Sequence, residues 1–262
     1  MLFPGACLVC RQPLVRIGRL PVCGECWSGL KSYHGPACAE CGRPFPSSVP
    51  LLTDTPLCGL CRQGVFHFER ARYFGLYEGS LRQMVLLLKF GRQEQLGYRL
   101  GRLLGDAYRF HEEVQQCRLV VPVPLHRARK RERGFNQAEA LAAGVARSLG
   151  LSLNSGILHR IRPTPPQTGL SYGARRRNVQ GAFEVRGRSL RGQPVLLVDD
   201  VMTTGATAHA CAMRLKQAGA EKVLVLTLAR AEPLVWERDA ALAGSAPSPT
   251  DEGGRTPLEV RE

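Results

Sequence analysis

A ten-residue stretch of this 262-residue sequence has the residue types and spacing of a ligand site. Near its start are two adjacent carboxylates, which can accept hydrogen bonds from a vicinal diol or hold the Mg²⁺ that accompanies a polyphosphate. It continues with threonine hydroxyls and a glycine at the start of a helix, where amide groups favour an anion and a phosphate can come close to the backbone. A diol beside a phosphate is a sugar phosphate. The stretch comprises Val198, Asp199, Asp200, Val201, Met202, Thr203, Thr204, Gly205, Ala206 and Thr207.

Two other interpretations of this stretch were weighed. A nucleoside-triphosphate P-loop is a poor one, because no lysine follows Gly205 and no Gly-x-x-x-x-Gly-Lys precedes the helix. The other is an ordinary strand-to-helix turn in which Asp and Thr act as caps. Against it, two carboxylates at the end of a buried strand are costly unless they have a use.

The second set of chemically capable residues is eight cysteines near the start of the chain. They form four Cys-x-x-Cys pairs, and two such pairs complete a tetrahedral site for zinc. We expect the first pair to join the second and the third to join the fourth, because short loops close with less loss of entropy. A redox role for one pair is the competing interpretation, and one of the two sites could be vestigial or empty. The expected ligands are Cys7, Cys10, Cys23, Cys26, Cys38, Cys41, Cys58 and Cys61, whereas Cys117 and Cys211 are expected to be buried apolar residues.

The elements that must position the acidic pair are a strand and a helix. The run Val195–Val198 has no alternation of polar residues, which is typical of a parallel strand covered by helices on both faces. Residues 206–215 have helical spacing, and 223–228 supply another buried strand. Ligands of parallel sheets bind at the carboxyl ends of the strands, which is where the acidic pair would lie.

Other elements are expected around this core. A strand is predicted over 72–77, helices from 80 to about 90 and from 94 to about 115, and a strand over 119–126 followed by a basic loop. A helix is then expected to open at 134–137. Guanidinium groups in a loop suit a pyrophosphate, although a nucleic-acid contact or a solvated surface explains them equally well; the residues are Arg127, Arg129, Lys130, Arg131 and Arg133. Lys89 is either a phosphate ligand or a surface partner of a helix dipole. The proline-containing segment 157–183 is expected to be irregular, as a functional loop or lid or as a disordered insertion.

The stretch Val198–Thr207 resembles the binding motif for phosphoribosyl pyrophosphate (PRPP) of type I phosphoribosyltransferases. The resemblance implies that the acidic pair, Asp199 and Asp200, acts on the ribose and that the Thr-Thr-Gly-x-Thr loop binds the 5-phosphate. The four Cys-x-x-Cys pairs, Val-Pro-Val-Pro-Leu-His before the basic residues, and Arg-Gly-Phe-Asn-Gln after them make the chain similar to the ComF family. That family implies an α/β type I phosphoribosyltransferase fold preceded by a small cysteine-rich zinc-ribbon domain.

The ComF resemblance also implies a role in natural transformation. Its expected ligands are Mg²⁺ with PRPP, two structural Zn²⁺ ions and single-stranded DNA, and its expected partners are a competence helicase and a recombination mediator. Two classes of function stay open: a DNA-handling protein with a PRPP site, and an active phosphoribosyltransferase of nucleotide or purine/pyrimidine salvage metabolism. The absence of a nucleobase pocket in the sequence favours the first, and the complete PRPP motif favours the second.

Composition limits the alternatives. The net charge is +14, which fits a polyanionic partner or an arginine-rich solvated surface. No apolar run has transmembrane length and no signal peptide is expected, so a cytoplasmic protein is predicted. The length accommodates one α/β core with an appendage, and the expected boundaries are 1–65 for the zinc ribbons, 66–232 for the phosphoribosyltransferase-like domain and 233–262 for a disordered tail.

Overall fold

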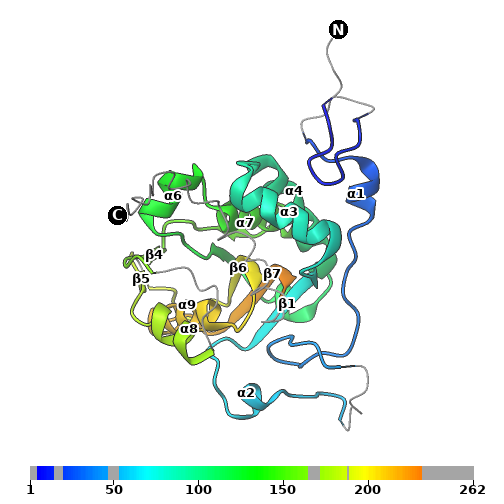
Figure 1. Cartoon of the computed structure of the whole chain (residues 1–262). Helices are drawn as coiled ribbons and strands as arrows, with labels where there is room; N and C mark the ends of the chain where they lie inside the picture. Colours follow the sequence, from blue (N-terminus) through cyan, green and yellow to red (C-terminus); the bar gives the residue numbers. More distant parts are fainter. Residues whose placement is uncertain (1–4, 15–19, 47–52, 165–171, 188, 232–262) are drawn as a thin grey trace, which may run out of the picture.

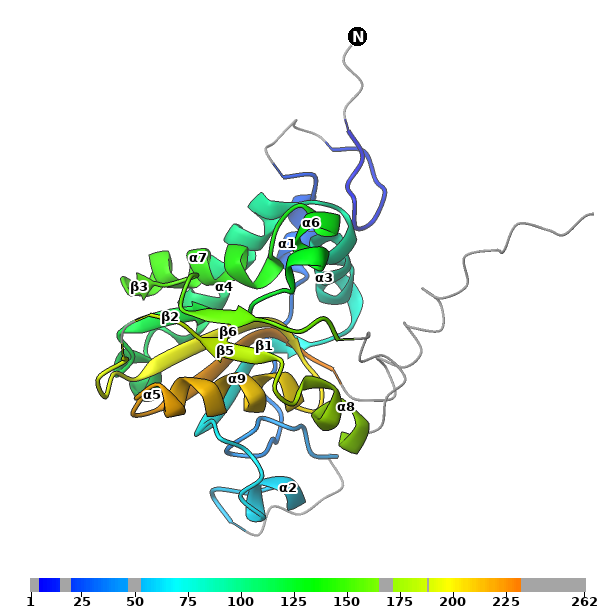
Figure 2. The same ribbon diagram turned by 90° about the vertical axis from the view of Figure 1, so that its left-hand side faces the viewer.

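The computed structural model describes residues 5–14, 20–46, 53–164, 172–187 and 189–231. Its centre is a parallel sheet with helices on both faces (Figures 1 and 2). The strands lie in the order β1 (Arg70–Leu76), β7 (Val223–Arg230), β6 (Val195–Met202), β2 (Leu119–Pro122) and β3 (Ser152–Leu153). Every pairing in this sheet is parallel. The expected fold class is therefore confirmed at the level of its sheet.

The strand β6 occupies the middle of the sheet because its residues can be buried on both faces. Val195, Leu196, Leu197 and Val198 are each at most 1% exposed. Their neighbours on β7, such as Val223 opposite Val195, are buried as well. The unbroken apolar run thus formed the strand that the sequence predicted.

Helices cover both faces of the sheet, as the two views show. One face carries α3 (Gly79–Phe90), α4 (Glu94–Tyr108) and α7 (Gln137–Leu149). Glycines at Gly101 and Gly144 let α4 and α7 approach so closely that a Cβ at either position would collide with the backbone of the other helix. The opposite face carries α9 (Ala206–Gln217), against which α8 (Tyr172–Val179) packs.

The expectation of one helix from 94 to 115 was wrong. The helix α4 ends at Tyr108, and a separate short helix α5 (Glu112–Gln115) follows. The break turns the chain back toward the sheet, so that Val114 and Cys117 become buried just before β2 begins. Burial of these apolar side chains outweighs the helical propensity of the intervening residues.

The expectation of an irregular segment over 157–183 was also wrong at both of its ends. The strands β4 (Leu158–Arg160) and β5 (Phe183–Val185) form a small antiparallel hairpin. The helix α8 begins at Tyr172, after the prolines. The residues 165–171, which carry much of the expected loop or lid, lie outside the described residues, as does the expected tail.

The cysteine-rich segment wraps the sheet from one face to the other (Figure 1). The helix α1 (Gly24–Ser28) lies beside α3 and α4, whereas α2 (Gly59–Arg62) lies on the side of α9. Between them, residues 31–45 run along the outer edge of β1, and we call them the edge strap. The amide of Tyr33 donates to the Phe74 carbonyl at 2.8 Å, and the amide of Ala71 donates to the Glu40 carbonyl at 2.6 Å.

Two further results concern the isolated cysteines and the character of the helices. Cys117 and Cys211 are both fully buried, as expected. Within the described residues, no helix combines the length and the apolar character needed to cross a membrane.

Candidate functional site

The acidic pair lies at the carboxyl end of β6, next to the carboxyl end of β2. Pro122, the last residue of β2, pairs with Val198, and Asp199 follows directly. The amide of Asp200 donates to Asp199 Oδ1 at 2.8 Å, and the amide of Val201 donates to Asp200 Oδ1 at 2.9 Å. The backbone of the strand end thereby fixes both carboxylates. Asp200 is buried, whereas Asp199 is partly exposed.

Lys89 provides the counter-charge of Asp200. Its Nζ atom lies 3.3 Å from Asp200 Oδ2, and only 10% and 7% of the two side chains are exposed. Lys89 is thus neither at the surface nor dedicated to a helix dipole, because it reaches inward from the end of α3. Burial would raise the pKa of Asp200, but Lys89, the hydrogen bond with Asp199 and then Arg133 outweigh it, so this pKa lies below its ordinary value.

The two carboxylates differ in their affinity for a proton. Burial first, and then the negative charge of Asp200, raises the pKa of Asp199 well above its ordinary value. Within the pair, Asp200 is therefore the more acidic carboxylate. Carboxylate oxygens can accept hydrogen bonds from the hydroxyls of a ligand.

The loop after β6 leads into the first turn of α9. Gly205 is the N-cap of this helix and has φ 80°, a left-handed conformation that favours glycine. A Cβ at Gly205 would lie 2.9 Å from the Met202 methyl group and 3.0 Å from the Phe66 ring. Phe66 comes from the segment that leads out of α2, so this segment supports the loop from behind. The side chain of Thr204 accepts a hydrogen bond from the amide of Ala206 at 3.4 Å.

The basic segment is a helix, α6 (Arg127–Arg133), and not the loop that the sequence led us to expect. His126 caps its start by accepting from the amide of Ala128, and Gly134 ends it at φ 84°. Arginine, lysine and alanine are good helix formers, which explains the regular structure. The helix separates the five basic residues by orientation, because Arg129 and Arg133 are partly buried while Arg127, Lys130 and Arg131 are exposed.

Arg133 belongs to the face of α6 that turns toward the acidic pair, and Arg129 lies one helical turn before it on the same helix. Burial lowers the pKa of Arg133, and the charges of Asp200 and Asp199 oppose this shift. By contrast, Lys130 points elsewhere and forms an ion pair with Glu139 on α7 at 2.9 Å. Of the five predicted residues, the structure thus brings Arg133 toward the acidic pair, keeps Arg129 partly buried one turn away and leaves the other three exposed.

Arg160 is a site residue that the sequence reasoning did not assign. It ends β4, and its guanidinium carbon lies 5.4 Å from the centre of the Phe183 ring. Burial lowers the pKa of Arg160, and the charge of Asp199 is among the influences that oppose the shift. Arg160 is therefore, after Arg133, a second guanidinium group that feels the charge of the acidic pair. No spacing signal singled it out from the other arginines of its proline-containing segment.

The eight cysteines form two groups of four, paired as expected. One group is Cys7, Cys10, Cys23 and Cys26, and the other is Cys38, Cys41, Cys58 and Cys61; in each, the four Sγ atoms lie within 4.8 Å of one another. We call them the first and second tetrads. None of the ten cysteines forms a disulfide.

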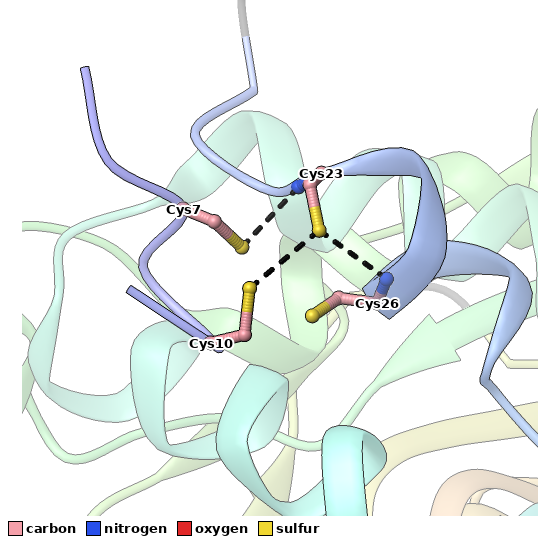
Figure 3. A group of neighbouring side chains, drawn as sticks. All are labelled: Cys7, Cys10, Cys23 and Cys26. Atoms are coloured by element: carbon pink, nitrogen blue, oxygen red, sulfur yellow. Dashed lines mark hydrogen bonds between the residues drawn. The ribbon is translucent and has the colours of Figure 1, made fainter. Parts of the chain in front are cut away.

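The geometry of both tetrads fits a tetrahedral metal ion. In the first tetrad, Cys10 Sγ lies 3.7 Å from Cys23 Sγ, and the amide of Cys23 donates to Cys7 Sγ (Figure 3). In the second, Cys41 Sγ lies 3.6 Å from Cys58 Sγ. Zinc with four sulfur ligands at about 2.3 Å places neighbouring sulfur atoms about 3.8 Å apart. The two tetrads are therefore consistent with two zinc sites.

The tetrads differ in burial and in what surrounds them. All four cysteines of the second tetrad are buried, whereas Cys10 is exposed and Cys23 is half-buried. The second tetrad shares a hydrophobic cluster with Met202 and Ala206 of the loop region. The first packs into the cluster on the opposite face of the sheet, with α3 and α4. The zinc-ribbon segment therefore contributes to the same cores as the sheet.

Comparisons with known proteins agree with both parts of this architecture. Residues 1–62 match the double zinc ribbon domain, and residues 131–241 match the phosphoribosyl transferase domain. The chain is 33% identical over 230 residues to competence protein F of Haemophilus influenzae, covering 86% of this chain and 96% of that protein.

Further relatives have the same extent. DNA utilization protein YhgH of Salmonella typhimurium is 33% identical, covering 87% of this chain and 97% of that protein. Competence protein ComFC of Bacillus subtilis is 28% identical over 212 residues, covering 80% and 84%. The paired cysteine tetrads, the parallel sheet and these matches lead to one conclusion: the chain belongs to the ComF family of competence proteins, with a double zinc ribbon and a phosphoribosyltransferase domain.

Proposed function

We propose that this protein binds PRPP together with Mg²⁺ at the carboxyl ends of β6 and β2, and that it binds single-stranded DNA over the adjacent basic helix α6. The observation that carries the proposal is the position of Arg133 of α6, whose guanidinium group feels the charges of both Asp200 and Asp199. A ribose diol, a 5-phosphate and a pyrophosphate require carboxylates, helix-start amides and guanidinium groups close together. These three kinds of group meet at this edge of the sheet.

The proposed roles follow the chemistry of each group. Asp200, held by Lys89, accepts a hydrogen bond from one ribose hydroxyl, and Asp199 accepts one from the second hydroxyl. The first turn of α9, with the hydroxyls of Thr203 and Thr204, holds the 5-phosphate. The pyrophosphate would lie toward Arg129, Arg133 and Arg160.

The carboxylate oxygens at Asp199 and Asp200 are a donor set that suits Mg²⁺. When bound, the ion would neutralise charge on the pyrophosphate. In a transfer reaction at carbon 1 of the ribose, the arginines would likewise neutralise the charge of the pyrophosphate leaving group.

The exposed residues Arg127 and Arg131 are the proposed start of the DNA surface. Lysine and arginine contacts to phosphates give affinity that falls steeply as the salt concentration rises. Relatives of this chain are named for competence and for DNA utilization, which supports a proposed role in the handling of DNA. A competence helicase and a recombination mediator are the partners that we propose for that role.

A second candidate is an active phosphoribosyltransferase of nucleotide or purine/pyrimidine salvage. The match to the phosphoribosyl transferase domain over residues 131–241 favours it. The two candidates differ in whether pyrophosphate is released when PRPP and a nucleobase are both present. A panel of nucleobases assayed for released pyrophosphate separates them.

Calorimetric titration of the zinc-loaded protein with PRPP and Mg²⁺ tests the PRPP site. The double variant with Asp199→Asn and Asp200→Asn should lose saturable binding. Glu221→Gln is the matched control, because it removes a carboxylate just before the start of β7, at the opposite end of the strands. Unchanged binding in the double variant would remove the ribose assignment.

A further inference from the structure

The turn that joins α3 to α4 exposes an aromatic ring beside the proposed PRPP site. Phe90 is 69% exposed, although Leu88 is fully buried and Lys89 reaches inward to Asp200. Single exposed apolar residues are common on protein surfaces, so the exposure alone decides nothing. What distinguishes Phe90 is its position, because it follows the residue that holds the acidic pair.

The turn has a defined conformation. Arg92 is exposed and adopts φ 51°, an uncommon value for a residue other than glycine. The side chain of Gln93 donates to the Gly91 carbonyl at 3.0 Å and closes the turn. Phe90, as the last residue of α3, therefore stands directly before a turn of defined shape, and the side chain of Arg92 is exposed in that turn.

Arg133 connects this ring to the acidic pair. Its guanidinium carbon lies 5.7 Å from the centre of the Phe90 ring, within the range of a cation–π contact. The same guanidinium is partly buried and feels the charges of Asp200 and Asp199. A ring, a guanidinium group and two carboxylates therefore follow one another from the surface into the site.

This arrangement of the ring, the guanidinium group and the carboxylates favours one chemical class of ligand. A planar ring can stack on Phe90, while Arg133 and the exposed arginines around it favour a negatively charged neighbour and disfavour a cation. A planar heterocycle joined to phosphates is a nucleotide unit. Stacking of bases on aromatic side chains is the usual way in which proteins hold unpaired bases.

We propose that Phe90 and Arg133 form a stacking site for a nucleobase at the entrance of the sugar-phosphate site. The inference rests on the proposed function, for which it identifies a base-binding surface. The base can come from a single DNA strand or from a free nucleobase that serves as acceptor. The exposed Arg127 and Arg131 of α6 favour the strand, because they continue the basic surface beyond Arg133.

Binding of labelled single strands tests the site. An oligothymidylate and an abasic oligonucleotide of equal length are titrated at fixed salt, with fluorescence anisotropy as the readout. Phe90→Ala should weaken binding of oligothymidylate at least about fivefold, since one base stack on an aromatic ring contributes about 1–3 kcal/mol. The same variant should bind the abasic strand as the wild-type protein does, because only the base is lost from the contact.

Phe110→Ala is the matched control, because Phe110 is also broadly exposed, at 85%, but follows the distant end of α4. It should bind oligothymidylate within twofold of the wild-type protein. Phe90→Trp should retain the affinity, and oligothymidylate should quench its added emission whereas the abasic strand should not. Quenching by adenine or thymine in the presence of PRPP, without quenching by the oligonucleotide, would assign the site to a free acceptor base.

Equal loss of affinity on both strands overturns the inference, and so does unchanged affinity for oligothymidylate in Phe90→Ala when no free base quenches Phe90→Trp either. So does the absence of binding to every oligonucleotide and free base. Failure of the PRPP site gives a different result. The wild-type protein would then show no saturable heat with PRPP, while Phe90→Ala would still weaken binding of oligothymidylate and not of the abasic strand.

Discussion

Removing the buried charge of Lys89 should destabilise the fold by several kcal/mol. At 3.3 Å and an effective dielectric constant of about 20, the attraction between Lys89 and Asp200 is about 5 kcal/mol. The variant Lys89→Met preserves much of the side-chain volume but leaves Asp200 buried without its counter-charge. Breaking such a pair from one side costs about 3–5 kcal/mol, because the remaining charge stays desolvated.

The loss of stability in Lys89→Met should depend on pH, and the titration of Asp200 sets the direction of this dependence. In the wild-type protein the pKa of Asp200 is lowered, so its stabilising contribution is present above the ordinary value of about 3.9 and is lost as pH falls through the folded value. Without Lys89, burial would raise this pKa instead. The penalty in Lys89→Met is then largest at neutral pH and shrinks as the carboxylate takes up a proton in acid.

Urea unfolding of the zinc-loaded protein at pH 8 and pH 5 measures both effects. The control Lys216→Met removes a lysine from the ion pair with Glu69, of which about a third of each side chain is exposed, and should cost about 1 kcal/mol or less. A cycle of Lys89→Met with Asp200→Asn should give a coupling of about 2 kcal/mol. Equal deficits at the two pH values, with coupling below about 0.5 kcal/mol, would refute a buried ion pair at this position.

Three further predictions concern the loop, the metal sites and acid stability. Gly205→Ala should lower the free energy of unfolding by about 2–3 kcal/mol and weaken PRPP binding, because it combines left-handed backbone strain with close contact to Phe66. The control Gly150→Ala has φ 68° but open space around the added methyl group, so in urea unfolding it should show the backbone strain alone, at about 1 kcal/mol. A chromophoric chelator should remove one zinc ion quickly and the second slowly, because the first tetrad is more exposed than the second, and Cys10→Ser should abolish the fast phase. Burial, followed by the charges of His67 and Arg176, lowers the pKa of His209 to about 4. On acidification the unfolded chain therefore takes up a proton before the folded protein does, and the free energy of unfolding falls between pH 6.5 and 4, by about 1–2 kcal/mol for a half-buried group. This loss should be smaller in His209→Gln, as unfolding at pH 7 and pH 5 would measure.

The core of the fold was predictable because its signals are local. An unbroken apolar strand, a helix with apolar spacing and a Cys-x-x-Cys pair each depend on a few neighbouring residues. The pairing of the tetrads followed from loop length alone. The turn after β6 was placed correctly because the carboxyl end of a parallel strand is set by the strand itself.

The parts that sequence reasoning missed depend on contacts between distant segments. The helical state of 127–133 was missed because a run of arginines after prolines resembles a loop, although its residues favour helix. Lys89 and Arg160 come from segments far from Asp200 in the chain, so only the packing of α3 and the β4–β5 hairpin brings them close. The contact of Phe66 with Gly205 likewise joins the zinc-ribbon segment to the phosphate loop without a local signal.

The edge strap has a consequence for the order in which the chain can fold during synthesis. Strand β1 is made early, whereas its partner β7 leaves the ribosome on the order of ten seconds later. In that interval the strap can already cover the outer edge of β1 through its bonds to Phe74 and Ala71. An open strand edge is a template for pairing with other chains. Because Cys38 and Cys41 of the second tetrad lie in the strap, metal binding by this tetrad should order the strap early and shorten the time for which the outer edge of β1 is open.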